Sequence, residues 1–403
     1  MKVSLRIAEF LRPDSFTGRE LRRGLIAEMA KSTGIDRHTV AALLANKAQN
    51  ISLAALGRIS DYLIKHHGAD PAALPSGLLR RDPEHFWSML ASCQKIDFCL
   101  GARKAMEWQG ADYVMSSDAR LQGRMLSKVS TFVTSAKAQR PSSEKPEAAE
   151  AGARVQYPGF QFHLVPAPGR KVTYENPGSD WANVRKKAEQ LYARIEANTA
   201  YACLALGSVK VNPLAEMMYA RAFSAQPFVN EDSVEDPSDR HCPAVCIFRT
   251  TDPRPPSCAG GLRLAAKMSV EEPGFYFEKE DGQWEACVWD RDLCDAAIFF
   301  YAYYPNLAHV DVACGGFSFR ATNCLTKDLE WIVSQAGEPQ YISDRIQLGL
   351  YVIRFTFDRT STDYDEYHDN RPFETEVIPV PKAVLQRRLE RVAESSQKGA
   401  GQL

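Results

Sequence analysis

The spacing of apolar residues divides the chain into two parts with different predicted structure. In residues 1–79 they recur every three or four positions, which predicts short amphipathic helices joined by tight turns. Residues 80–136 continue this pattern less regularly, and we expect them to be mainly helical, including the span 82–100. From residue 157 onward, short apolar runs alternate with helix-like segments, which predicts an α/β layered region with some antiparallel strand pairs.

Residues 26–47 carry the most informative local pattern. Ala30 is small enough to let two helices cross closely, and Gly34 follows it after four residues. Gly34 can adopt the positive φ angle that a three-residue turn between two helices requires. Val40 and Leu43 then lie one helical turn apart, where they can pack back on the first helix. The pattern therefore predicts a helix, a tight turn and a second helix.

Capping residues mark the limits of these helices. Asp36 is placed to cap the second helix, and Ser52 to cap a third helix that ends before Gly68. This third helix has four apolar residues at helical spacing, with which it is expected to close the core of a small bundle: Leu53, Leu56, Ile59 and Leu63.

Over roughly residues 8–79 this arrangement resembles the helix-turn-helix domain of the Cro and phage-repressor (Xre-like) family. The resemblance implies that the second helix, about residues 37–46, enters the major groove of double-stranded DNA and reads base edges, while neighbouring residues contact phosphates. The alternative is a helical bundle that binds only protein. The DNA-binding residues that the resemblance implies are Arg22, Arg23, Arg37, His38, Thr39, Ala42, Asn46, Lys47 and Gln49.

The distribution of charge agrees with a polyanion partner for the front of the chain. The net charge of the whole sequence is −1, but residues 1–140 hold 21 Lys and Arg against 13 Asp and Glu, a net charge of +8. The remainder carries −9. A basic front and an acidic back suggest that only the front meets a nucleic acid.

The amino-acid composition indicates where one predicted domain ends and the next begins. Residues 135–154 are rich in Ala, Pro, Ser, Glu and Lys and have no large apolar side chain, which predicts a flexible linker that we place at residues 137–156. We expect a helix-turn-helix DNA-binding domain at 1–79, a mainly helical connecting region at 80–136, an α/β sensor or oligomerisation domain at 157–380, and a C-terminal helix and tail at 381–403. The predicted fold class is thus multidomain, with an all-α helix-turn-helix bundle followed by an α/β layered, Rossmann-like domain.

The apolar segments of the sequence also indicate in which compartment the protein is expected. No stretch approaches 18 consecutive apolar residues, and the first residues lack the apolar segment of a secretion signal. We therefore expect a cytoplasmic protein that does not contact membranes, with its ten cysteines as free thiols.

Two segments of the α/β region share a strand, a glycine turn and a helix, the first at Gly207 and the second at Gly316. Such turns let the backbone approach a ligand at the carboxyl end of a strand, beside a helix N-terminus that attracts anions. Tight turns without a ligand are the alternative. Neither segment is GxGxxG or a P-loop, so no standard cofactor is expected. The candidate ligand site consists of Gly207, Ser208, Asn212, Gly316, Ser318, Arg320 and Thr322.

Catalytic and metal-binding chemistry has less support in the sequence. No nucleophilic triad is visible, and Glu216 is the only acid close to either glycine turn. Asp290, Asp292 and Asp295 follow a Trp-rich hairpin and could serve as acid and base, but a charged turn is the commoner role. The run from His241 to Cys258 lacks the paired CxxC spacing of structural zinc sites, so we expect no metal.

These observations favour a sequence-specific transcriptional regulator, most simply a repressor, over an enzyme. One small domain gives limited affinity, so we expect a homodimer on a palindromic operator, with a small molecule or nucleotide as ligand. The alternative is an effector enzyme, for example in defence, that processes a nucleotide or sugar and carries an accessory helix-turn-helix. That alternative requires a titratable group with a shifted pKa in the pocket. A third alternative is a scaffold whose α/β domain only oligomerises.

Overall fold

The computed structural model describes residues 3–390 except 6, 12–14, 18–19, 46, 49, 72–73, 75–77, 82–84, 105–111, 139–157, 170, 174–175, 199, 230–239, 262–271 and 359–371. Nearly all of the predicted linker and the predicted tail beyond residue 390 lie outside these residues. The ten cysteines are free thiols. Among the described helices, none has the length and apolar character needed to cross a membrane.

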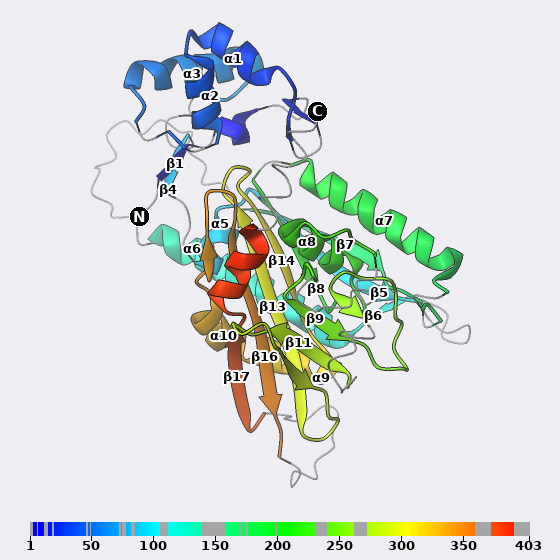
Figure 1. The fold of residues 1–403 in the computed structure, drawn as a ribbon. Helices are drawn as coiled ribbons and strands as arrows, with labels where there is room; N and C mark the ends of the chain where they lie inside the picture. The colour runs from blue at the N-terminus through cyan, green and yellow to red at the C-terminus, as the bar shows by residue number, and fades with distance from the viewer. Residues whose placement is uncertain are drawn as a thin grey trace.

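The N-terminal region is a cluster of three helices, seen together at one end of the molecule in Figure 1. Its helices are α1 (Leu25–Thr33), α2 (Arg37–Leu44) and α3 (Leu53–His67), preceded by a 3-10 helix (Ile7–Phe10). Two antiparallel pairs accompany them: β1 (Val3–Leu5) with β4 (Leu79–Arg81), and β2 (Phe16–Thr17) with β3 (Glu20–Leu21).

The predicted caps of these helices are confirmed, whereas α2 ends at Leu44, before the predicted limit of about residue 46. Gly34 ends α1 with a φ of 63°, and the Asp36 carboxylate accepts hydrogen bonds from the first-turn amides of α2. Ser52 caps α3 through the amide of Ala55. The prediction that Leu53 contributes to the core was wrong, because its side chain is 86% exposed at the first position of α3. The core is formed instead by residues that include Met29, Ile35, Val40, Leu43, Ile59 and Leu63.

The larger region is built on a mixed sheet of nine strands. Its central order is β15-β16-β13-β14-β8-β5-β6, with β17 beside β16 and β7 beside β5. The strands are β5 (Lys95–Arg103), β6 (Tyr113–Val114), β7 (Gly159–Pro166), β8 (Tyr201–Leu206), β13 (Cys294–Tyr304), β14 (His309–Gly316), β15 (Tyr341–Ile342), β16 (Gln347–Thr356) and β17 (Glu374–Pro379). Four neighbours, β7, β5, β8 and β14, run parallel, and β13, β16 and β17 continue the sheet antiparallel.

Helices cover both faces of this sheet. They are α5 (Phe86–Ala91), α6 (Ser116–Ala138), α7 (Gly178–Glu196), α8 (Pro213–Phe223), α9 (Phe319–Lys327) and α10 (Leu329–Ala336), and residues 382–390 are also helical. A smaller sheet contains β10 (Gly260–Gly261), β9 (Ala244–Ile247), β11 (Gly274–Glu278) and β12 (Trp284–Val288) in that order.

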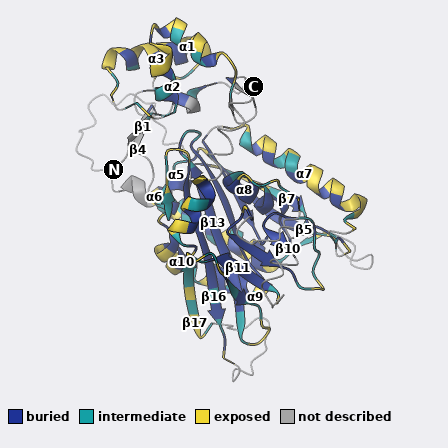
Figure 2. Cartoon of the chain, in the orientation of Figure 1, coloured by how far each residue is buried: buried dark blue, intermediate teal, exposed yellow. Residues whose placement is uncertain are grey.

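Alternation along the strands produces two separate cores. On β8, Tyr201 and Cys203 face α7, α8 and the smaller sheet, whereas Ala202 and Leu204 face α5, α6, α9 and α10. The strands are therefore buried on both sides, while α7 exposes one of its faces, as Figure 2 shows. The result is a layered α/β arrangement with apolar runs rather than alternation in its central strands.

The prediction of a mainly helical segment at 80–136 was wrong for residues 95–103. These residues form β5, which lies between β7 and β8 in the sheet. Ile96 and Phe98 enter one core and Cys99 the other, so the strand is apolar on both faces. An apolar run of this kind cannot be distinguished from a buried helix by periodicity alone.

We expect Gly315→Ala to lower the free energy of unfolding by about 1–3 kcal/mol, the usual cost of overpacking. A Cβ at this position of β14 would lie 2.5 Å from the carbonyl carbon of Gly207, and backbone cannot move aside as a side chain does. Urea unfolding followed by tryptophan fluorescence measures the change, because all six tryptophans lie between residues 87 and 331.

The matched control is Gly123→Ala on α6, where nothing lies within 4 Å of the added methyl. That variant is expected to be unchanged or up to about 1 kcal/mol more stable, because alanine favours helix. Equal stability of the two variants would contradict the close approach of β8 and β14.

Candidate functional site

The carboxyl ends of the parallel strands meet at one edge of the large sheet. The parallel strands β5, β8 and β14 end at this edge. The antiparallel strand β13 begins there, and its neighbour β16 ends there. The helix after β5 (α6) packs on one face and the helix after β8 (α8) packs on the other, which opens a crevice between the two strand ends. A cavity of about 780 Å³ lies at this edge.

The cavity is lined by five basic and five acidic side chains, four hydroxyl side chains, three aromatic rings and a few small or apolar residues. These residues are Arg103, Met115, Ser117, Asp118, Gly207, Ser208, Lys210, Val211, Arg249, Asp252, Pro253, Trp289, Arg291, Asp292, Asp295, Gly316, Phe317, Ser318, Phe319, Arg320, Thr322 and Asp358.

The β5–β8 end of the cavity holds a buried acid, Asp118, within the electrostatic influence of a base, Arg103. Asp118 lies in the first turn of α6, and its carboxylate packs against Gly207, which has a φ of 102° at the end of β8. Burial raises the pKa of Asp118 to about 6, against the opposing effects of the Arg103 charge and the hydrogen bond from Ser117. A carboxyl group that titrates near pH 6 inside a crevice is suited to exchanging a proton or accepting a ligand hydroxyl.

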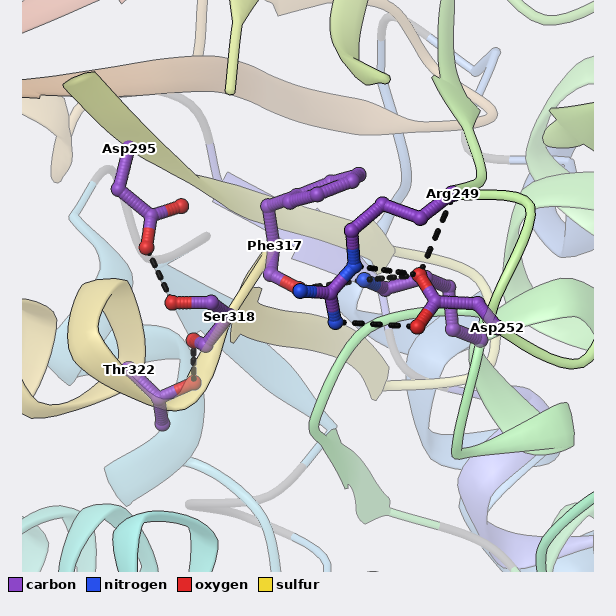
Figure 3. Close-up of polar contacts among 7 residues, drawn as sticks. Arg249, Asp252, Asp295, Phe317, Ser318 and Thr322 are labelled. Atoms are coloured by element: carbon purple, nitrogen blue, oxygen red, sulfur yellow. Dashed lines mark hydrogen bonds and ion pairs between the residues drawn. The ribbon is translucent and has the colours of Figure 1, made fainter. Parts of the chain in front are cut away.

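One wall of the cavity is a network of ion pairs and aromatic rings (Figure 3). Asp252, in the loop after β9, accepts hydrogen bonds from Lys210 at 3.2 Å and from the Arg249 guanidinium at 3.0 and 3.1 Å. The Lys210 ammonium lies 3.6 Å from the centre of the Phe317 ring, and Arg249 lies over Trp289. Burial lowers the pKa of Lys210; burial also acts to raise that of Asp252, but Lys210 and Arg249 bring it below its usual value.

The opposite wall is organised by the start of α9. Ser318 donates a hydrogen bond to Asp295 and accepts one from the amide of Arg320, which caps the helix. Thr322 accepts from the amide of Gly316 and donates to the carbonyl of Ser318, a contact visible in Figure 3. Burial raises the pKa of Asp295. These bonds fix the turn between β14 and α9.

The structure brings six of the seven candidate ligand-site residues into this one cavity, namely Gly207, Ser208, Gly316, Ser318, Arg320 and Thr322. Asn212 does not line it. Its fully buried amide donates to the carbonyls of Cys99 and Leu206 at 2.8 and 3.0 Å, so it ties β5 to β8 beneath the cavity. The short side chain that caps α8 is therefore structural.

Glu216, the acid nearest to either turn in sequence, also lies away from the cavity. Its buried carboxylate accepts hydrogen bonds from Ser257 and from the amides of Cys258 and Phe228. The carboxylates that do line the cavity come from four other segments. Asp118 was missed because Ser and Asp at 116–118 are typical helix-capping residues, and Arg249 and Asp252 follow a strand without any glycine signal.

The residues with an expected role on DNA are mostly at the surface. Arg37, His38 and Thr39 are exposed on the first turn of α2, and Lys47 is exposed after it. Ala42 is half-buried. Asn46 and Gln49 lie outside the described residues, Arg23 is exposed, and Arg22 forms a 2.8 Å ion pair with Glu28.

Comparisons of the chain with protein-family models, with curated proteins and with solved structures found no match. Within the described ranges, no three His, Cys, Asp or Glu side chains come together in a way that holds a metal ion. The chemistry of the cavity must therefore be argued from its own side chains.

We expect Asp118→Asn to raise the free energy of unfolding by up to about 3 kcal/mol at pH 7.5, and by little at pH 4. The pKa of Asp118 is about 6 in the folded chain and 3.8 without its surroundings, so the folded state binds more protons between these values. Stability therefore falls as pH rises through this window, and the substitution removes that loss.

Urea unfolding at several pH values measures the effect, with Asp112→Asn, an exposed acid before α6, as the control. A gain from Asp118→Asn that stays constant from pH 4 to pH 7.5 would show that this carboxyl group is not the titrating one.

Proposed function

We propose that the chain is a sequence-specific DNA-binding transcriptional regulator, most simply a repressor, whose α/β region senses a ligand in the cavity. The observation that carries the proposal is the exposed first turn of α2. Arg37, His38 and Thr39 point away from the core, while Val40 and Leu43 on the same helix are buried against the bundle. A helix held this way can present its N-terminal residues to base edges in a major groove.

The turn before α2 supports this role. Gly34 and the Asp36 cap fix where α2 begins, and backbone hydrogen bonds from Thr39 and His38 help to lower the pKa of Asp36. The three side chains that face outward supply a guanidinium, an imidazole and a hydroxyl. A guanidinium can pair in a bidentate manner with guanine, and a threonine can contact a thymine methyl or a phosphate.

The way in which helices connect the parallel strands of the α/β region supports a sensing role. Its four parallel strands have helices on both faces and a crevice where the connections diverge, as in doubly wound folds that bind ligands there. A ligand that favours one arrangement of the two regions would change DNA affinity by its difference in binding. Two copies on a palindrome, with half-sites about one helical turn apart, would supply the affinity that one small domain lacks.

Arg37→Ala is expected to reduce discrimination between the operator and random DNA by roughly 1–3 kcal/mol, as loss of a base contact does. Lys47→Ala serves as the matched variant, because a phosphate contact contributes equally to both DNAs. Fluorescence anisotropy at several salt concentrations measures both, starting with DNA from the protein's own upstream region.

Equal loss of affinity for operator and random DNA with Arg37→Ala would remove this residue from base reading. If the unaltered chain shows no sequence preference across genomic DNA fragments, the proposal of a transcriptional regulator is wrong.

Asp118 favours a second candidate function, an effector enzyme that processes a nucleotide or sugar. The pKa of its carboxyl group, about 6, and the lowered pKa of the Lys210 ammonium give the cavity titratable groups suited to acid–base chemistry. Turnover of nucleotides or sugar phosphates that disappears with Asp118→Asn, and persists with Asp112→Asn, would support it. Ligand binding without turnover would leave the regulator.

A further inference from the structure

Arg103 is the one base of the cavity lining that lacks a hydrogen bond or ion pair from its side chain within the described ranges. It ends β5 at the crevice, and its Nε atom is buried without a hydrogen-bond partner. An unsatisfied guanidinium nitrogen at a buried position is costly. An anionic group bound in the cavity would satisfy it.

The remaining bases with described contacts are already committed to protein groups. Lys210 and Arg249 share the carboxylate of Asp252. The Nε atom of Arg320 is also buried without a hydrogen-bond partner, but unlike Arg103 its guanidinium stacks on Phe357 at 3.3 Å and donates to the carbonyl of Arg291 at 3.0 Å. The position for a ligand anion is therefore beside Arg103 rather than at the centre of the charged wall.

The cavity also presents an aromatic ring that the fold leaves uncovered. Phe319, the first residue of α9, lines the cavity and is 45% exposed, whereas the Phe317 ring beside it is buried and holds Lys210. A large apolar ring in a concave polar site is suited to stacking a planar ligand group. Arg103 and Phe319 line the same cavity, whose volume of about 780 Å³ is within the range of small-molecule sites.

The lining also supplies hydrogen-bond acceptors, among them the carboxylate of Asp118. The Asp118 carboxylate packs on Gly207, and both residues line the cavity. A sugar hydroxyl is a hydrogen-bond donor that a carboxylate binds well.

We propose that the cavity binds a nucleotide, with its phosphate on Arg103, its sugar hydroxyls toward Asp118 and its base stacked on Phe319. The proposal rests on the proposed function, since it names the ligand class of the sensing region. A nucleotide combines an anion, hydroxyl donors and a planar ring, whereas a sugar phosphate lacks the ring and a nucleoside lacks the anion.

Isothermal titration calorimetry of the full chain without DNA tests the ligand class, using AMP, GMP, CMP and UMP as probes. At least one of these nucleotides is expected to bind. Its nucleoside should bind roughly tenfold to a hundredfold more weakly, because the charged hydrogen bonds to Arg103 are lost. Ribose 5-phosphate should bind roughly fivefold to a hundredfold more weakly, because stacking is lost.

Two variants assign the residues. Arg103→Gln should weaken binding of the nucleotide toward that of the nucleoside, and Phe319→Ala should weaken it toward that of ribose 5-phosphate. The matched controls are Lys104→Gln, the next residue, which pairs with Asp180 at the surface, and Trp331→Ala, which is also 45% exposed but lies on α10. Both controls should bind as the unaltered chain does.

Each other outcome overturns a stated part of the proposal. If nucleosides bind as tightly as nucleotides, Arg103 does not act as an anion site. If ribose 5-phosphate binds as tightly as a nucleotide, Phe319 does not act as a stacking site. No binding of any nucleotide overturns the proposal as a whole. If Phe319→Ala loses nucleotide binding while a correctly folded Arg103→Gln variant binds as tightly as the unaltered chain, Arg103 does not hold the phosphate.

DNA binding measured without nucleotide keeps the two proposals separate. If the chain binds an operator but no nucleotide, the proposed regulatory function stands and the proposed nucleotide site is wrong. Nucleotide binding with no sequence-specific DNA binding overturns the regulator and leaves the cavity assigned.

Discussion

The divergence of two helices from neighbouring parallel strands sets the position of the cavity. α6 follows β5 onto one face of the sheet and α8 follows β8 onto the other, so neither helix can cover the strand ends between them. Buried hydrogen bonds from Asn212 hold those two strand ends together. The loops that carry Arg249 and Trp289 contribute further lining residues to the opening.

The charged wall of the cavity is preorganised. Asp252 receives Lys210 and Arg249, and both bases also lie on aromatic rings. These contacts give both bases hydrogen-bond partners within the protein, although the two cations share a single carboxylate, and they leave the ends of the cavity as the places where a ligand adds new contacts. This separation between a satisfied wall and unsatisfied ends is the reason that a ligand with chemically different ends suits the site.

Local signals in the sequence predicted the parts of the molecule that depend on local chemistry. Gly34, Asp36 and Ser52 act through neighbours within three residues, and the structure bears them out. Glycine turns after two strands likewise led to lining residues of the cavity. β5 was not predicted, because a strand buried on both faces shows no alternation. Asp118 joins the cavity only through the pairing of distant strands, which no single window of sequence contains.

Burial gives the charges of the two proposed sites different sensitivity to ionic strength. Arg37 and Lys47 are exposed, so dissolved ions screen them over about 8 Å at physiological salt. The side chains of Lys210 and Asp252 are largely buried, so dissolved ions screen their ion pair much less. A rise in salt would therefore weaken contacts of Arg37 and Lys47 with the proposed nucleic acid more than it weakens the Lys210–Asp252 ion pair.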